Sequence, residues 1–271
     1  MEEGRRGIVI TVFSTASAVG KTLISINMAA ELVREGYRVC LVDLDLQFGD
    51  VANYLHLDAE LSLADAQKAL QVNMEAFNVR DFLTVYGYEG WSFEVLPSPF
   101  KLEEAYNIST KAVGHILQQL QFDYDFVVVD TTSAFSELNL AVMDLSTIIT
   151  FLGIVDFIPT IKNMKIGCDT IHSLGYEANK IRIVLNRSNS KTKIDLEDVE
   201  QLLGEPFYHI LPNAFEPARK SIQTGVPLVY SSSNALASEL RNLVERYTNR
   251  ATTRMESQEG VSSWFKKIFN G

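Results

Sequence analysis

The chain has 271 residues, of which 24 are Lys or Arg and 34 are Asp or Glu, so its formal net charge is −10. An acidic protein gains nothing from long-range attraction to a polyphosphate backbone, which disfavours a protein that coats nucleic acid. Hydrophobic residues make up 46% of the chain, which suffices for a core and excludes global disorder. No stretch reaches the about 20 apolar residues that span a bilayer, and the N-terminus lacks a signal-peptide layout. The two cysteines, Cys40 and Cys168, lack metal-site neighbours and favour a reducing cytosol.

Short β-branched runs alternate with helical patterns along most of the chain. The pattern predicts strands at 7–13, 38–43, 93–96, 126–130, 148–153 and 181–186. It predicts helices at 21–35, 63–70, 109–122, 158–174 and 234–247, with a loop over residues 44–60. The strands are continuously apolar, which indicates burial on both faces, and their alternation with helices indicates βαβ units. The predicted fold is therefore α/β, a doubly wound and mostly parallel sheet with helices on both faces, in one domain over residues 1–247.

A loop of small residues, STASAVGKT at 14–22, joins the first strand to the first helix. Small residues let backbone N–H groups approach phosphate oxygens, and the helix N-terminus favours an anion. As in a P-loop, Lys21 would reach the β- and γ-phosphates and the Thr22 hydroxyl would ligate Mg²⁺. The strict motif has glycine where this chain has Thr15, so a tight strand–helix turn with a capping threonine is the alternative. The candidate nucleotide-binding residues of this loop are Ser17, Ala18, Val19, Gly20, Lys21 and Thr22.

Acidic residues stand where two buried strands end. Asp43 and Asp45 lie at the end of the second strand, and Asp130 ends the strand at 126–130. Ligands of open α/β sheets bind at the carboxyl ends of the strands. Asp130 is therefore placed as a Walker-B carboxylate that holds Mg²⁺ through water. Three such acids together with a G-K-T loop favour a nucleotide site over unrelated helix caps and surface charges.

Three segments resemble the MinD/ParA superfamily of P-loop ATPases. They are GIVITVFSTASAVGKTLISINMAAELVREGYRVCLVDLDLQFGDVANYL, YDFVVVDTTS and VLNRSNSK, which resemble the phosphate loop with the D-x-D switch segment, the Walker-B strand and the base-binding loop. The resemblance covers residues 7–247. Within the superfamily, VDLDLQFGDV, LPSPFKLEEA and NRSNSK are most similar to the CpaE/TadZ branch, whose members help to localise type IV/Flp pilus assembly machinery.

The resemblance implies that the ligand is ATP or ADP with Mg²⁺. Asp45 would be catalytic together with Lys21, because it would orient or activate the attacking water. Asp43 would support the Mg²⁺ shell beside Thr22 and Asp130.

The resemblance also implies a site for the base. Asn186 would hydrogen-bond the adenine, in a loop that includes Arg187. Pro212 and Asn213 would border the base together with Leu211. Asp130 would begin switch II.

The loop departs from the family pattern K-G-G-x-G-K-T. The family's first lysine reaches the phosphates of a partner subunit, and this chain has Ala16 there, with Ser17 and Ala18 in place of glycines. A methyl group cannot stabilise phosphate charge, and a Cβ atom is costly wherever φ must be positive. We therefore expect nucleotide binding with slow or negligible hydrolysis, and the lysine-dependent homodimer is left open.

The C-terminal end follows a polar linker at 248–260 and has amphipathic spacing. Residues 261–271 place an apolar stripe on one face of a helix and lysines on the other. A short helix of this kind can lie at a membrane interface and contact anionic lipid, as the C-terminal helix of MinD proteins does. The alternative is packing on the domain or on a partner protein. The candidate membrane residues are Val261, Trp264, Phe265, Lys266, Lys267, Ile268 and Phe269.

Three functions stay open at this point. The first is a CpaE/TadZ-like protein that uses ATP to localise a pilus or secretion assembly. The second is a MinD-like regulator of division-site placement, and the third is a nucleotide-binding scaffold without catalysis. The expected partners are a second copy of the chain, proteins of a pilus or division apparatus, and an anionic membrane, with no specific nucleic acid. The expected location is cytoplasmic, peripheral on the inner face of the cytoplasmic membrane.

Overall fold

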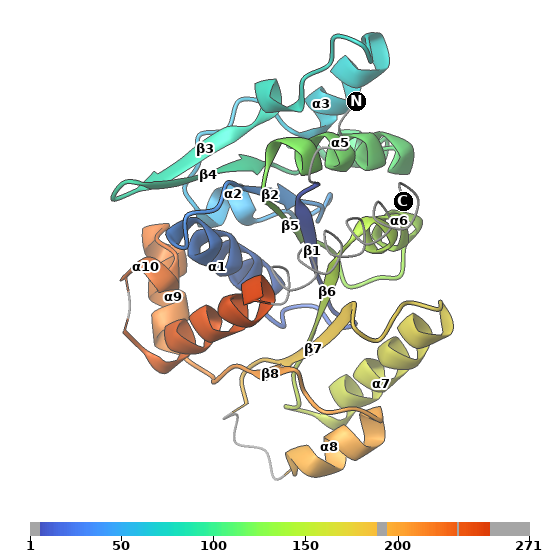
Figure 1. Cartoon of the computed structure of the whole chain (residues 1–271), viewed down its shortest axis with the longest axis vertical. Helices are drawn as coiled ribbons and strands as arrows, with labels where there is room; N and C mark the ends of the chain where they lie inside the picture. The colour runs from blue at the N-terminus through green and yellow to red at the C-terminus, as the bar shows by residue number, and fades with distance from the viewer. Residues whose placement is uncertain (1–5, 189–193, 232, 250–271) are drawn as a thin grey trace, which may run out of the picture.

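A computed structural model describes residues 6–188, 194–231 and 233–249 (Figure 1). Its centre is an eight-stranded sheet in the order β3-β4-β2-β5-β1-β6-β7-β8. Every neighbouring pair is parallel except β3 and β4, which are antiparallel. The strands are β1 (Ile8–Phe13), β2 (Val39–Asp43), β3 (Thr84–Tyr88), β4 (Trp91–Leu96), β5 (Phe126–Asp130), β6 (Ile148–Gly153), β7 (Ile181–Leu185) and β8 (His209–Ile210). The predicted α/β fold with a mostly parallel sheet is confirmed.

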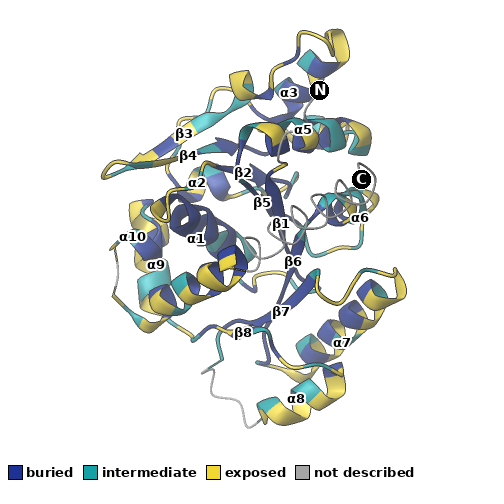
Figure 2. Ribbon diagram, viewed as in Figure 1, coloured by how far each residue is buried: buried dark blue, intermediate teal, exposed yellow. Residues whose placement is uncertain are grey.

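Helices cover both faces of this sheet. One face packs against α1 (Lys21–Arg34), α10 (Leu228–Ser231) and a helix over residues 235–249. The other face packs against α3 (Leu63–Val72), α5 (Thr110–Asp123), α6 (Glu137–Leu145), α7 (Ile158–Ser173) and α8 (Leu196–Leu203). The central strands β1, β2, β5, β6 and β7 are buried throughout, as Figure 2 shows, which explains their continuous apolar sequences.

Several elements were absent from the sequence prediction. The predicted loop at 44–60 contains α2 (Val51–Tyr54), and β3 and β8 were missed at the two edges of the sheet. The helices α6, α8, α9 (Phe215–Thr224) and α10 were missed as well. The edge strand β3 has only one buried residue and contains Gly87, so it lacks the continuous apolar pattern of the central strands.

The predicted helix at 234–247 begins at residue 235 and continues to residue 249, which takes in the first two residues of the predicted linker. The rest of the linker and the predicted amphipathic helix at 261–271 lie outside the described residues. Within the described part of the chain, no helix is long and apolar enough to cross a membrane.

Candidate functional site

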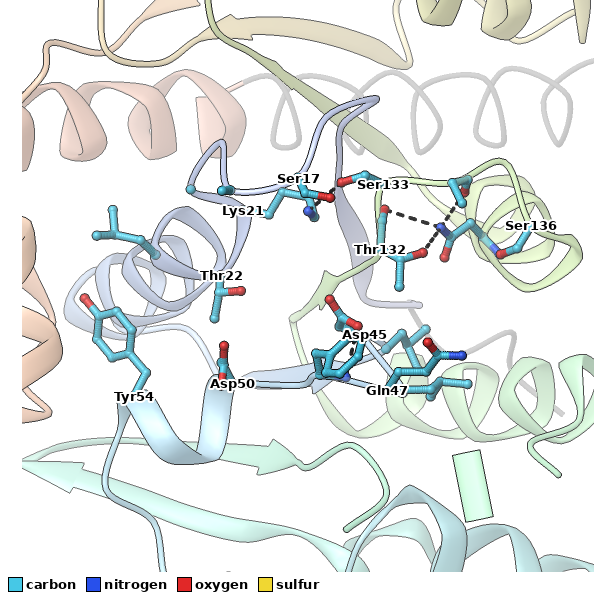
Figure 3. Close-up of a pocket in the computed structure, with 18 of the residues that line it drawn as sticks. Ser17, Lys21, Thr22, Asp45, Gln47, Asp50, Tyr54, Thr132, Ser133 and Ser136 are labelled. Carbon is cyan, nitrogen blue, oxygen red and sulfur yellow. Dashed lines mark hydrogen bonds between the residues drawn. The ribbon is translucent and has the colours of Figure 1, made fainter. Parts of the chain in front are cut away.

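A large cavity opens at the carboxyl ends of β1, β2 and β5 and has a volume of about 1080 Å³ (Figure 3). Its wall includes the loop before α1 with the first turn of that helix, the segment after β2 with two residues of α2, the segment after β5 with the start of α6, and one residue of α9. The structure brings six of the predicted site residues to this wall: Ser17, Ala18, Gly20, Lys21, Thr22 and Asp45. The phosphate-loop part of the predicted site and Asp45 therefore lie at one cavity.

The loop before α1 has the backbone of an anion-binding turn. Ala18 has φ of 58° and Gly20 has φ of 100°, so both lie in the left-handed region. Gly20 precedes the first helical residue and makes no side-chain cap, which leaves the first amides of α1 without a side-chain acceptor from that position. Amides in this arrangement point toward a bound anion and carry the positive end of the helix dipole. The sequence analysis expected a costly Cβ atom wherever φ is positive. This condition holds at Ala18 and not at Ser17, which has no positive φ.

Replacing Ala18 with glycine is expected to raise the free energy of unfolding by about 0.5–1 kcal/mol, because it removes a left-handed alanine. Urea denaturation measures the effect. Ala76→Gly is the control, since Ala76 is exposed and has no positive φ, and this change should destabilise the protein. Equal destabilisation by both changes would contradict the strain at Ala18.

Two carbonyl groups of the same loop accept hydrogen bonds from side chains of the segment that follows β7. Asn186 Nδ2 donates to the Val19 carbonyl at 2.8 Å, and Arg187 Nη2 donates to the Ala18 carbonyl at 2.9 Å. Satisfying these carbonyl groups on the outside leaves the amides free to face the cavity. Val19 itself is fully buried in the core. Sequence reasoning missed this support, since the two side chains lie far from the loop in sequence.

None of the four predicted base-site residues lines the cavity: Asn186, Arg187, Pro212 and Asn213. Asn186 is buried, and its Oδ1 accepts from the Arg187 amide. The contact of these residues with adenine stays a prediction.

Lys21 is oriented by a hydroxyl that the sequence analysis did not identify. Its Nζ donates to Ser133 Oγ at 2.9 Å, and Ser133 Oγ donates to the Ala16 carbonyl at 2.8 Å. Figure 3 shows Lys21 and Ser133 near each other on the cavity wall. The only signal in the sequence is a hydroxyl residue three positions after Asp130. Ser133 therefore connects the segment after β5 to both ends of the phosphate loop.

Asp130 lies buried behind the loop and accepts two hydroxyl hydrogen bonds. Thr22 Oγ1 donates to its Oδ2 at 2.7 Å, and Ser25 Oγ donates to its Oδ1 at 3.0 Å. Burial raises the pKa of Asp130 to about 6, although Thr22 and the charge of Lys21 oppose that rise. Thr22 and Asp130 thus place two oxygen groups of the kind that Mg²⁺ prefers beside each other, and their binding of Mg²⁺ stays a prediction.

Asp43 is paired with Asp130 in the register of β2 and β5 and is equally buried. Burial, together with the nearby Asp130 charge, raises the pKa of Asp43 well above its ordinary value. Two adjacent buried carboxyl groups repel each other when both are ionised, and a divalent cation would offset that repulsion. The carboxyl groups present at this site therefore fit Mg²⁺.

Asp43 also holds the segment that follows β2. Its Oδ1 accepts from the Asp45 amide at 3.0 Å and its Oδ2 accepts from the Val51 amide at 3.2 Å. A Cβ atom at Gly49 would lie 2.6 Å from Asp43 Oδ2 and closer still to Ser98 Oγ, so only glycine fits there. This packing keeps Asp45, which is partly exposed, on the cavity wall.

The parallel sheet, the phosphate loop and the acids at the strand ends define a P-loop nucleotide-binding protein. A sequence model of the CobQ/CobB/MinD/ParA nucleotide binding domain matches residues 10–226, and the chain belongs to this family. It is a nucleotide-binding protein of the MinD/ParA type.

Known relatives and solved structures are similar over most of the chain. The septum site-determining protein MinD of Thermotoga maritima is 21% identical over 248 residues, which covers 89% of this chain and 88% of that protein. The ParA family ATPase of Chlorobium tepidum superposes with a TM-score of 0.78 at 20% identity, over 89% of this chain and 98% of that one. MinD of Pyrococcus horikoshii, solved as a complex with Mg-ADP, superposes with a TM-score of 0.75 at 20% identity, over 90% of this chain and 97% of that one. At 20% identity, these superpositions establish a shared fold and nothing further about the chain.

Proposed function

We propose that the chain binds ATP or ADP with Mg²⁺ in this cavity and uses the nucleotide as a switching ligand with slow or negligible hydrolysis. The observation that supports this most directly is the left-handed phosphate loop with Lys21 beside it and the Thr22–Asp130 pair behind it. The similar MinD of Pyrococcus horikoshii was solved with Mg-ADP. Mg²⁺ would neutralise phosphate charge, with Thr22 and Asp130 holding it and Asp43 supporting its shell.

The weak hydrolysis follows from the residues of the loop. Ala16 offers a carbonyl to Ser133 and a methyl group, so it brings no charge to a transferring phosphoryl group. Asp45 remains the candidate for orienting water, because it lines the cavity. Catalysis by Asp45 and Lys21 would then lack one of the charges that stabilise the transition state.

A steady-state turnover assay tests this part of the proposal. Calorimetry should detect binding of Mg-ATP, while turnover should stay far below that of a family member with the signature lysine, assayed side by side. Ala16→Lys should leave binding in place and is the matched gain-of-charge variant. A wild-type turnover equal to that of the lysine-containing protein would contradict slow hydrolysis.

For the cellular role we propose a CpaE/TadZ-like protein that localises a pilus or secretion assembly, on the resemblance of the D-x-D and NRSNSK segments. The similarity to septum site-determining proteins favours the alternative, a MinD-like regulator of division-site placement. Affinity capture of the tagged chain distinguishes them, because pilus-assembly proteins would support the first role and division proteins the second. A scaffold without catalysis is supported if binding occurs with no turnover.

We further propose that residues 261–271 attach the chain to anionic membrane and that the chain forms a homodimer. One short helix binds a bilayer weakly, so two copies in a dimer would bind more stably. Deletion of 261–271 is expected to abolish co-sedimentation with anionic vesicles. Unchanged co-sedimentation would rule the segment out as the anchor, and sedimentation velocity with and without Mg-ATP tests the dimer.

A further inference from the structure

An apolar groove lies between α7 and α8, on the opposite face of the sheet from α1, with a volume of about 340 Å³. Its floor includes the buried Ile161 and Val199. Three large side chains on its walls remain open to solvent: Ile158 is 75% exposed, Ile166 52% and Leu202 50%. Figure 2 shows exposed residues along both helices. Apolar side chains gathered in this way mark a docking surface.

We infer that the C-terminal segment of the same chain, residues 261–271, docks into this α7–α8 groove. The first reason is where the described chain ends. Arg246, three residues before that end, donates to the Tyr208 carbonyl, and its guanidinium lies 3.9 Å from the centre of the Tyr208 ring. The neighbouring Phe207 amide donates to Glu200 Oε1 on α8 at 2.8 Å. Arg246, near the C-terminal end of the described chain, is therefore linked to α8 through Tyr208 and its neighbour Phe207.

The second reason is length. Residues 250–260 number eleven and reach about 36 Å when fully extended, and β8 is the edge strand of the sheet, so the linker passes no further strand on its way around that edge to α8. Residues 261–271 would form a helix of about 16 Å, and the groove wall from Ile158 to Ile166 rises about 12 Å along α7. The segment therefore fits the groove along its length.

The third reason is chemistry. The segment carries Trp264, Phe265, Ile268 and Phe269 on one stripe and two lysines on the other side. The α8 wall begins with Glu197 and Asp198, and Asp198 lines the groove. On the α7 wall, Lys162 and Lys165 line the groove, and Lys165 is paired with Asp169 at 2.6 Å. The apolar stripe thus meets an apolar floor, while Lys266 and Lys267 can face the acidic wall.

Docking of residues 261–271 in the groove would oppose their binding to a membrane, so this inference builds on the membrane proposal. The same apolar stripe cannot lie in the groove and in a bilayer at once. The groove therefore competes with lipid, and the apparent affinity for vesicles falls in proportion to the docked fraction.

Tryptophan fluorescence tests the docking directly, because the chain has two tryptophans and Trp91→Phe leaves Trp264 as the only one. Without lipid, Trp264 in this parent protein should emit in the blue and resist acrylamide, compared with a free peptide of residues 250–271. Leu202→Asp or Ile166→Asp should lower the ratio of docked to free segment by about tenfold, since each removes a buried aliphatic side chain from the contact. Phe122→Asp on α5, at a residue 56% exposed, is the matched control and should change nothing.

The outcomes separate cleanly. The inference is overturned if acrylamide quenches Trp264 in the parent protein as readily as in the peptide, or if the groove variants behave like Phe122→Asp. It is also overturned if dilution alone releases Trp264, because release on dilution would mean that the segment docks on another copy of the chain. Co-sedimentation with anionic vesicles should rise in the groove variants, and equal co-sedimentation in all variants would overturn the competition. Absence of vesicle binding in every variant contradicts only the membrane proposal, because quenching is measured without lipid.

Discussion

Replacing Lys21 with alanine is expected to weaken binding of ADP and ATP by about a hundredfold or more, as for the loss of one partner from a buried charge pair. The phosphate charge would then be met by backbone amides and Mg²⁺, without a lysine. The free protein should lose little stability, because the hydrogen bond from Lys21 Nζ to Ser133 has a typical net value of about 1 kcal/mol. Calorimetric titration with ADP and excess Mg²⁺ measures the affinity, and urea denaturation measures the stability.

Lys111→Ala on α5 removes the same charge from an exposed position away from the cavity wall and serves as the control. Its affinity for ADP should equal that of the wild type. The assignment of the phosphate loop would fail if Lys21→Ala and Lys111→Ala bound ADP equally well. It would also fail if the wild type bound no nucleotide at all.

Replacing Asp130 with asparagine is expected to stabilise the ligand-free protein above pH 6 while abolishing the contribution of Mg²⁺ to nucleotide binding. Burial raises the pKa of this carboxyl from 3.8 to about 6, so charging it in the folded protein costs about 3 kcal/mol. An amide avoids that cost and can still accept from Thr22. Ser25 can turn its hydroxyl to the Lys21 carbonyl, to which it already donates at 3.0 Å.

The pH dependence has a definite sign. Between pH 4 and about pH 6 the folded protein binds more protons at Asp130 than the unfolded chain, so stability falls as pH rises through this window. Asp43, whose pKa is also raised, contributes with the same sign. Urea denaturation without Mg²⁺ at pH 5 and pH 8 should show a clear loss in the wild type and a smaller loss in Asp130→Asn. A variant that is less stable than the wild type at pH 8 would contradict a carboxyl group held at a cost.

The sequence predicted the central sheet because five of its inner strands are buried on both faces and therefore continuously apolar. It located the phosphate loop for a similar reason, since a strand, G-K-T and a helix follow one another in the chain. Both signals are local. The edge strands carry no such signal, because β3 is half-exposed and β8 has two residues. Helix α9, with Pro217 in its first turn and one buried residue, was missed for the same reason.

The parts of the site that escaped prediction depend on contacts between distant segments. The Asn186 amide meets the Val19 carbonyl across 167 positions, and Lys21 meets Ser133 across 112. Asparagine and serine are common loop residues, so their type alone does not indicate a role. The role becomes visible only from the sheet order, in which β5 lies beside β1 and β7 lies two strands away from β1. The positions of Asp43 and Asp130 were predictable because both residues end buried strands. The supporting hydrogen bonds were not, because they depend on rotamers.

Asp43 accepts hydrogen bonds from both ends of the segment after β2. The strength of these two hydrogen bonds therefore depends on whether the Asp43 carboxyl group is ionised. Its two carboxyl oxygens accept from the amides of Asp45 and Val51, and an ionised carboxylate accepts more strongly than a protonated one. A cation at Asp130 favours the ionised form of its neighbour. We therefore expect the exchange of these two amide hydrogens with deuterium to slow on addition of Mg²⁺ and nucleotide. A pair of ordinary backbone protons can thus report metal occupancy without any added label.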